Sequence, residues 1–108
     1  MKARTKALAI PPAVKQAVAQ RDSADGWPCC IYCGTPAPTD HPTAYSCAHY
    51  IARSQGGLGI EENILTLCPK CHKRYDATEH REEMRRLFRL YLEVKYKNWQ
   101  EENLTYQK

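Results

Sequence analysis

Four cysteines in the sequence are spaced as two pairs that could hold one metal ion. Cys30 and Cys33 are separated by two residues, and Cys68 and Cys71 repeat this spacing further along the chain. A tetrahedral zinc ion accepts four thiolates, and a tight turn that carries CxxC supplies two of them. Two disulfides or buried free thiols are the alternatives, and Cys29 could replace Cys30 through a CxxxC spacing. We expect the four paired cysteines to bind one Zn²⁺.

The histidine that follows the second pair is available for other chemistry. His72 adjoins Cys71, but four thiolates already complete a zinc shell, so its imidazole is not needed there. His49 and Asn63 lie at the end of one predicted strand and the start of the next. A strand, a glycine-containing loop, a strand and a helix can bring these two residues and His72 together. The remaining cysteine in this region, Cys47, is expected to be a small core residue.

The segment before the first cysteine pair is predicted to contain one helix. Residues 1–10 are expected to form a loose basic arm. Pro11 and Pro12 suit the first turn of a helix, where a missing N–H costs nothing. Apolar residues at helical spacing carry this helix to about Arg21. The Pro-rich residues 27–43, which carry the first cysteine pair, are expected to be a loop with little regular structure.

The elements that would position His49, Asn63 and His72 follow from the hydrophobic pattern. Strands are predicted at residues 44–51 and 63–67, with a glycine-containing loop between them. A helix is expected to begin near Pro69, and a longer one spans about residues 78–98. The longer helix is predicted to bury an apolar stripe formed by Met84, Leu87, Phe88, Tyr91 and Val94.

Length, composition and charge limit the class of protein. The chain has 108 residues, enough for one small domain, and 26% charged with 43% hydrophobic residues is typical of globular proteins. No apolar run approaches the roughly 18 residues that a membrane helix needs. The initial MKARTK lacks the apolar region of a signal peptide, so we expect a cytoplasmic protein with reduced cysteines. The net charge of +4 is concentrated at two basic ends, which is compatible with a polyanionic partner.

The motifs taken together resemble one known family. Residues 48–76, AHYIARSQGGLGIEENILTLCPKCHKRYD, resemble the core of the HNH endonucleases when they are joined to the upstream CxxCG motif. The resemblance covers about residues 20–76 and is closest to small phage and prophage proteins. It implies a small α+β fold, in which a ββα-metal core is accompanied by an N-terminal helix, a structural zinc site and a C-terminal helix. The expected division of the chain is a basic arm at 1–10, a nuclease core with the zinc site at 11–77, and a helix with a tail at 78–108.

The resemblance also implies a role for each polar residue of the core. His49 matches the general base that takes a proton from water, and Asn63 matches a residue that bonds the backbone across the loop and so holds His49. His72 matches the ligand of a catalytic divalent cation. Ala48 stands where the family usually has a second metal ligand, and it can ligate nothing. Asp76, one helical turn after His72, is a candidate substitute, and aspartate at position 48 is expected to restore a ligand.

The function implied by the resemblance is hydrolysis of DNA phosphodiester bonds. Zn²⁺ would be structural, and a separate cation, Mg²⁺, Mn²⁺, Co²⁺ or Ni²⁺, would serve catalysis. Arg53, Lys73 and Arg74 are candidate contacts to the DNA backbone. A further set of arginines shares one helical face, as either a phosphate-binding stripe or a solvated surface: Arg81, Arg85 and Arg89.

Two other functions remain open. One is a non-catalytic zinc module that binds nucleic acid or a phage protein, and Ala48 is its best support. The other is a zinc knuckle for protein interaction, which the basic ends of the chain disfavour. Neither the cleavage specificity nor the oligomeric state follows from the sequence.

Overall fold

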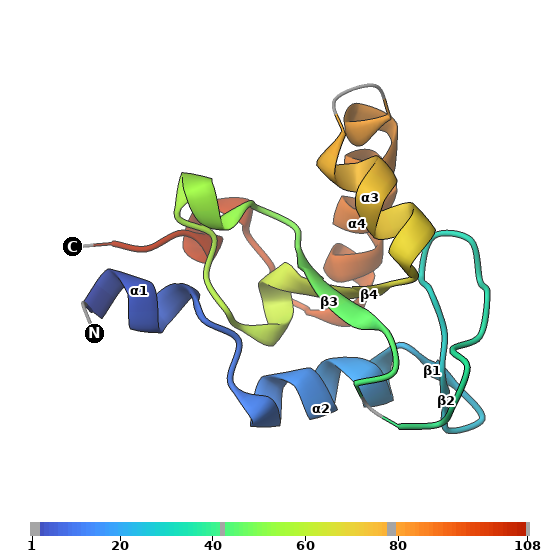
Figure 1. The fold of residues 1–108 in the computed structure, drawn as a ribbon. Coiled ribbons are helices and arrows are strands. Elements are labelled where there is room, and N and C mark those ends of the chain that lie inside the picture. The colour runs from blue at the N-terminus through green and yellow to red at the C-terminus, as the bar shows by residue number, and fades with distance from the viewer. Residues whose placement is uncertain (1–2, 42, 78–79, 108) are drawn as a thin grey trace.

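A two-stranded antiparallel sheet lies at the centre of the molecule (Figure 1). The structure is a computed structural model that describes residues 3–41, 43–77 and 80–107. Strand β3 (Ser46–His49) pairs with β4 (Ile64–Leu67), with Ser46 opposite Leu67 and His49 opposite Ile64. Both predicted strands are therefore present, although each is shorter than its hydrophobic pattern suggested. The fold is α+β and is consistent with the ββα-metal architecture.

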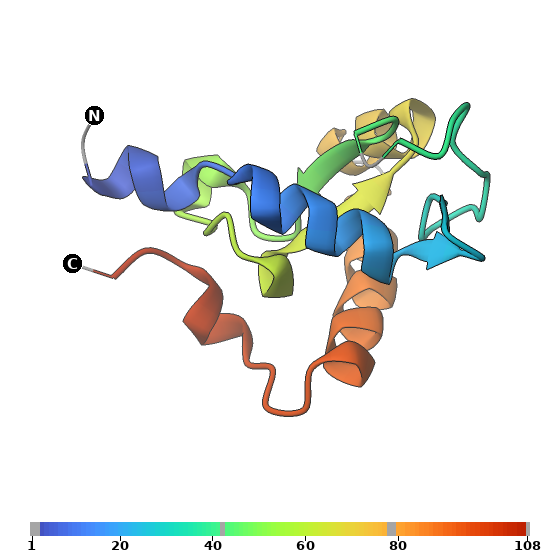
Figure 2. The same ribbon diagram turned by 90° about the horizontal axis from the view of Figure 1, so that it is seen from below.

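Three helices cover the sheet. Helix α2 (Pro12–Arg21) packs on one side of β4, whereas α3 (Pro69–Asp76) follows β4 directly and contacts both strands; α4 (Arg81–Lys95) packs beside α3 (Figures 1 and 2). Every residue of β4 is buried, because the strand is covered on both faces. Both α2 and α3 carry a proline in their first turn, as predicted. Within the described ranges, each helix is too short or too polar to span a bilayer.

The remaining elements are short. A small hairpin, β1 (Ser23–Ala24) and β2 (Trp27–Pro28), follows α2 and leads into the loop with the first cysteine pair. Single turns of 3₁₀ helix interrupt the loops: η1 (Arg53–Gln55), η2 (Glu61–Asn63) and η3 (Glu101–Leu104).

The prediction of a loose N-terminal arm is wrong. Residues Ala3–Leu8 form helix α1, and Leu8 is buried against the core. The backbone N–H of Gly59 donates to the Ala7 carbonyl at 3.0 Å. A Cβ at Gly59 would lie 1.9 Å from the Ala9 carbonyl oxygen, so only glycine permits this close approach. The arm is therefore an ordered part of the domain.

Helix α4 buries a different stripe from the one predicted. Met84, Phe88 and Leu92 are fully buried, and Phe88 packs on the Tyr75 ring with centroids 4.9 Å apart. Leu87 and Val94, which were expected in this stripe, are 42% and 82% exposed. Successive buried residues four positions apart define the face that meets the core, and Leu87 and Val94 lie outside it. The predicted start of the helix, residues 78 and 79, lies outside the described residues.

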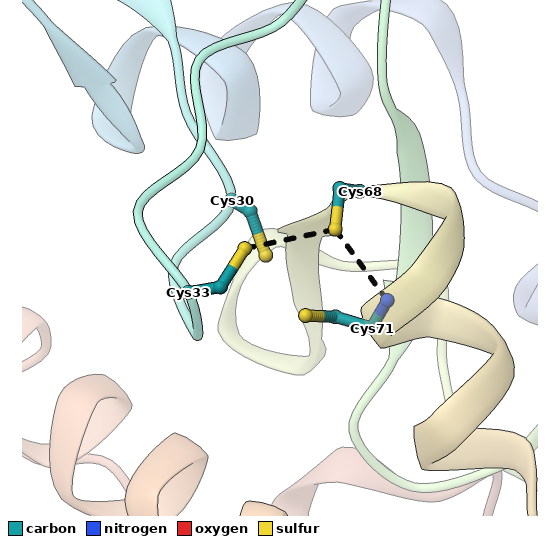
Figure 3. Close-up of side chains that lie close together, drawn as sticks. All are labelled: Cys30, Cys33, Cys68 and Cys71. Atoms are coloured by element: carbon teal, nitrogen blue, oxygen red, sulfur yellow. Dashed lines mark hydrogen bonds between the residues drawn. The ribbon is translucent and has the colours of Figure 1, made fainter.

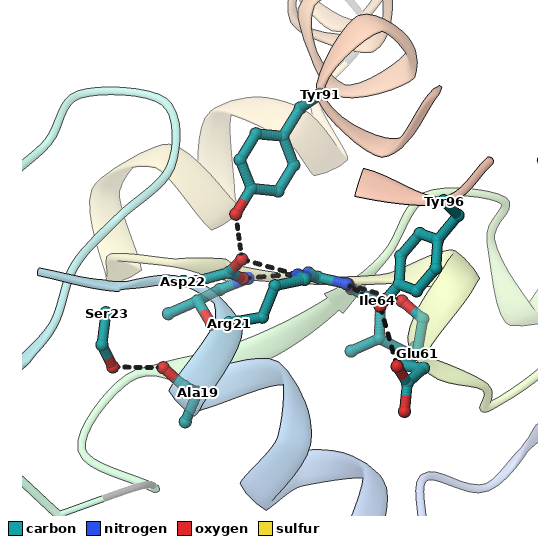
Figure 4. A network of polar contacts seen from close by, with 9 residues as sticks. Ala19, Arg21, Asp22, Ser23, Glu61, Ile64, Tyr91 and Tyr96 are labelled. Carbon is teal, nitrogen blue, oxygen red and sulfur yellow. Dashed lines mark hydrogen bonds and ion pairs between the residues drawn. The ribbon is translucent and has the colours of Figure 1, made fainter. Parts of the chain in front are cut away.

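A buried polar network joins α2 and α4 to the sheet (Figure 4). The Arg21 guanidinium donates to the Ile64 carbonyl at 2.7 Å and to both carboxylate oxygens of Asp22. The Asp22 carboxylate also accepts from the backbone N–H of Thr66 at 3.0 Å and from the Tyr91 hydroxyl. Each buried charge is thus paired and hydrogen-bonded, which limits the cost of burying it. The network holds β4 in place, and with it the start of α3.

Candidate active site and four-cysteine metal centre

The two cysteine pairs converge in space (Figure 3). The Sγ atoms of Cys30, Cys33, Cys68 and Cys71 all lie within 4.8 Å of one another, and those of Cys33 and Cys68 are 3.7 Å apart. With Zn–S bonds of about 2.3 Å, two sulfur atoms of a regular tetrahedron are separated by about 3.8 Å. The sulfur positions therefore match the size of a tetrahedral thiolate site.

Local backbone structure brings each pair into position. Gly34 has a φ of +79° directly after the first pair, and its N–H donates to the Cys30 carbonyl at 2.9 Å. This left-handed conformation favours glycine and closes the turn. The second pair begins at the N-cap of α3, where the Cys68 sulfur accepts from the backbone N–H of Cys71 at 3.4 Å. One pair thus sits on a loop, and the other on a helix start.

The electrostatics of the cluster favour a cation. Burial raises the pKa of the Cys30 and Cys71 thiols, whereas the Thr35 hydroxyl lowers the pKa of Cys33 to about 6. A bound cation would offset the cost of ionising the buried thiols. Cys29 lies outside the cluster, with its sulfur 3.4 Å from the Trp27 carbonyl, so it does not replace Cys30. The four clustered cysteines fit a bound metal such as zinc.

A second site lies at the end of β3, where a cavity of about 330 Å³ opens beside α3. It brings together four residues that the sequence singled out: His49, Arg53, His72 and Asp76. The other residues that line it are Ile10, Cys47, Ala52 and Arg81.

His49 is held by the N-terminal segment. Its Nε2 lies 3.0 Å from the Leu8 carbonyl oxygen, and because a carbonyl only accepts, Nε2 carries the proton. Nδ1 is then left with its lone pair. Burial lowers the pKa of His49 and outweighs the opposite effect of the hydrogen bond to the Leu8 carbonyl, while the nearby Arg53 charge lowers it a little further. The imidazole is therefore neutral at pH 7 and can accept a proton.

His72 is oriented by contacts at both ring nitrogens. The Ser46 hydroxyl lies 2.8 Å from Nδ1, and the Asp76 carboxylate lies 3.8 Å from Nε2. Ser46 belongs to β3, so the hydrogen bond ties α3 to the strand that carries His49. With the ring held at Nδ1, Nε2 lies 3.8 Å from the Asp76 carboxylate and has no closer hydrogen-bond partner among the described residues.

Asn63 acts on the loop and does not line the cavity. Its side chain is fully buried, and Oδ1 accepts from the Ile51 N–H at 2.8 Å. Nδ2 donates to the carbonyls of Ile51 at 3.3 Å and Leu58 at 2.9 Å. The amide bonds the backbone across the loop, as expected. It anchors the chain two residues beyond His49.

Two expectations about β3 need correction. Ala48 is 1% exposed, sits opposite Leu65 within the hydrophobic core, and does not line the cavity. Alternate residues of a strand face opposite sides, so position 48 points away from the side shared by Cys47 and His49. Aspartate there would bury a carboxylate and not restore a metal ligand. Cys47, expected in the core, is half-buried and lines the cavity.

The structure also places residues that the sequence did not single out or left undecided. Lys73 and Arg74 follow His72 on α3 but do not line the cavity, whereas Arg81 does. The strand register could have indicated Ser46, since Ser46 pairs with Leu67, which directly precedes Cys68, the N-cap residue of α3. The Leu8 carbonyl had no sequence signal, because every residue carries one.

Comparison with known protein families gives one match. Residues 30–78 match the family model described as HNH endonuclease. No curated protein matches the chain. The matched segment contains both cysteine pairs, both strands of the central sheet and α3. Residues 30–78 are therefore an HNH endonuclease domain.

Proposed function

We propose that this chain is a metal-dependent endonuclease that hydrolyses phosphodiester bonds in DNA. The observation that carries this proposal is that His49 and His72 line one cavity within an HNH domain. Arg53 and Asp76 line the same cavity. A base, a metal ligand and a cationic side chain are the groups that phosphodiester hydrolysis needs.

In this proposal His49 is the general base. Its Nε2–H is occupied by the Leu8 carbonyl, so Nδ1 takes the proton from the attacking water. The lowered pKa keeps the ring neutral and ready to accept at pH 7. Asn63 supports this role by fixing the backbone of the loop that follows His49.

His72 and Asp76 are the residues that would hold the catalytic cation. When bound, such a cation stabilises negative charge on the phosphate and on the leaving 3′ oxygen. A site with an imidazole ligand favours later first-row metals, so we expect Mn²⁺, Co²⁺ or Ni²⁺ to support more activity than an equal concentration of Mg²⁺. The four-cysteine cluster would hold Zn²⁺ as a structural ion, separate from this site.

We expect the sugar–phosphate backbone of DNA to face the cavity. Arg53 stands in the cavity wall, while Lys73 and Arg74 lie on the flanking helix. We propose that Arg53 meets a phosphate near the cleaved bond. Lys73 and Arg74 would contact the backbone further along, where they contribute to affinity and not to the chemical step.

A non-catalytic DNA-binding module is the second candidate. It is favoured by the sparse ligand set beside His72. Across the ranges 3–41, 43–77 and 80–107, the four cysteines are the only group of three or more metal-ligating side chains whose atoms cluster within 4.8 Å. The catalytic cation would therefore depend on water and on the DNA phosphate for most of its ligands, and such a site could have lost activity.

Nicking of supercoiled plasmid DNA separates the two candidates. Wild-type protein is incubated with Mg²⁺ or Mn²⁺, with an EDTA control, beside His72→Ala. The proposal expects metal-dependent nicking that His72→Ala abolishes, while this variant keeps its four-cysteine metal. DNA binding without nicking under every metal condition would leave only the non-catalytic module.

A further inference from the structure

One cationic side chain of the cavity comes from outside the HNH domain. Arg81 is the first residue of α4, three positions beyond the matched segment, and it lines the cavity together with His49 and His72. We propose that Arg81 binds a phosphate group of the DNA backbone in this cavity. This inference rests on the proposed function, since it names a substrate contact of that same site.

Arg81 differs from the two arginines that share its helical face. Arg85 donates to the Tyr50 hydroxyl and lies 3.2 Å from the Glu101 carboxylate. This ion pair links α4 to η3. Arg89 pairs with Glu93 at 3.0 Å. Among the residues that the structure describes, no carboxylate lies within 4.0 Å of the Arg81 guanidinium. Of the three arginines on this helical face, Arg81 is therefore the one that lines the cavity.

The Arg81 guanidinium is held in place before any ligand binds. Its Nη1 donates to the Tyr75 carbonyl at 3.1 Å, and its Cζ lies 4.6 Å from the centroid of the Tyr75 ring. The Tyr75 ring is itself fixed, because it is buried, donates to the Tyr50 carbonyl at 2.7 Å and packs against Phe88. A guanidinium fixed on such a platform loses little entropy when it binds an anion.

The donors that remain suit a phosphate. A guanidinium has five N–H groups in a planar fork, and the Tyr75 carbonyl uses one of them. The other donors can form the paired hydrogen bonds that recognise phosphate oxygens. Arg53 and Arg81 give the cavity two cationic side chains, against which Asp76 is the one carboxylate among its lining residues. An anionic ligand is therefore favoured in the cavity as a whole.

The test compares DNA binding of Arg81→Gln, Arg81→Lys and Arg89→Gln, all in a His49→Ala background and without added divalent cation, so that no cleavage occurs. Affinity for a short DNA duplex is measured over a series of salt concentrations. Each phosphate contact contributes close to one to the slope of log Kd against log salt concentration. Zinc content and thermal melting establish that each variant is folded.

We expect Arg81→Gln to weaken binding about tenfold and to reduce the salt slope by about one. Arg81→Lys should keep the slope, because it keeps the charge, but weaken binding several-fold, because an ammonium lacks the planar fork. Arg89→Gln should leave both quantities unchanged. A slope for Arg81→Gln equal to that of Arg89→Gln would overturn the proposal, as would wild-type affinity in Arg81→Lys.

The result is independent of catalysis. If the otherwise wild-type protein fails to nick DNA but Arg81→Gln still lowers the slope, the nuclease proposal fails and the phosphate site stands. If the protein nicks DNA and Arg81→Gln behaves like Arg89→Gln in both slope and nicking rate, the phosphate site fails and the nuclease proposal stands.

Discussion

Replacing Cys33 by serine tests whether the four-cysteine cluster is a folding site for zinc. The side chain is one of four whose sulfur atoms lie within 4.8 Å of one another, and its sulfur is 3.7 Å from that of Cys68. Serine removes one thiolate with almost no change in volume. The neighbouring Cys29→Ser is the matched control, because Cys29 lies outside the cluster, with its sulfur 3.4 Å from the Trp27 carbonyl.

The expected loss of stability is large compared with the free energy of unfolding of a small domain. Structural zinc supplies about 10–16 kcal/mol of apparent binding free energy, which appears as folding free energy. Native domains are stable by only about 5–15 kcal/mol. Even a net loss of about 3 kcal/mol would lower the melting temperature by roughly 12–24 °C for a chain near this size. We therefore expect Cys33→Ser to be largely unfolded at 37 °C.

The assay is zinc content by elemental analysis together with thermal melting followed by circular dichroism. Wild type, Cys29→Ser and His72→Ala should each retain about one zinc per chain, because none of these changes removes a cluster ligand. Cys33→Ser with a full zinc content and a wild-type melting temperature would refute the assignment. Loss of zinc in Cys29→Ser would show that the ligand set is wrong.

Three further predictions concern the loop and the base. Asn63→Ala should lower the free energy of unfolding by about 3 kcal/mol or more in a urea titration, because two buried backbone groups and one part-buried backbone group lose their partner; a change below about 1 kcal/mol would contradict this. Gly59→Ala should reduce nicking about 100-fold, since the new Cβ would clash with the Ala9 carbonyl and displace the neighbouring Leu8 carbonyl that holds His49; a wild-type rate would argue against that role. The nicking rate should fall as the pH drops through the pKa of His49, which lies below 6.5, and be flat around pH 7; a midpoint above pH 7 would exclude His49 as the base.

The sequence predicted the parts of the site that depend on short spacings. Both strands, the helix after the second cysteine pair and the convergence of the four cysteines followed from periodicity and from CxxC motifs. His49 and His72 were assigned to one site because a strand, a loop, a strand and a helix can bring them together. The structure confirms the strands, the helix and the cysteine cluster, and both histidines line one cavity, because each inference depends on local geometry or on one compact unit of the chain.

The parts that failed depend on packing between distant segments. Helix α1 was missed because its basic residues have no apolar periodicity, and its position depends on the close approach of Ala9 to Gly59. Position 48 was assigned to the metal site by resemblance alone, although strand alternation places its side chain opposite to that of His49. Arg81 could not be separated from its neighbours on the helix face without knowing which of them has a carboxylate partner.

The most direct test of the central claim is the single-turnover rate of plasmid nicking in His49→Ala, measured beside His41→Ala. His41 is exposed and lies outside the cavity, so this control should nick at the wild-type rate. A positioned general base contributes about two to four orders of magnitude, and we expect His49→Ala to lose that much while its zinc content and melting temperature stay unchanged. If a folded His49→Ala protein nicks DNA as fast as His41→Ala, the cavity at the end of β3 is not the site of the reaction.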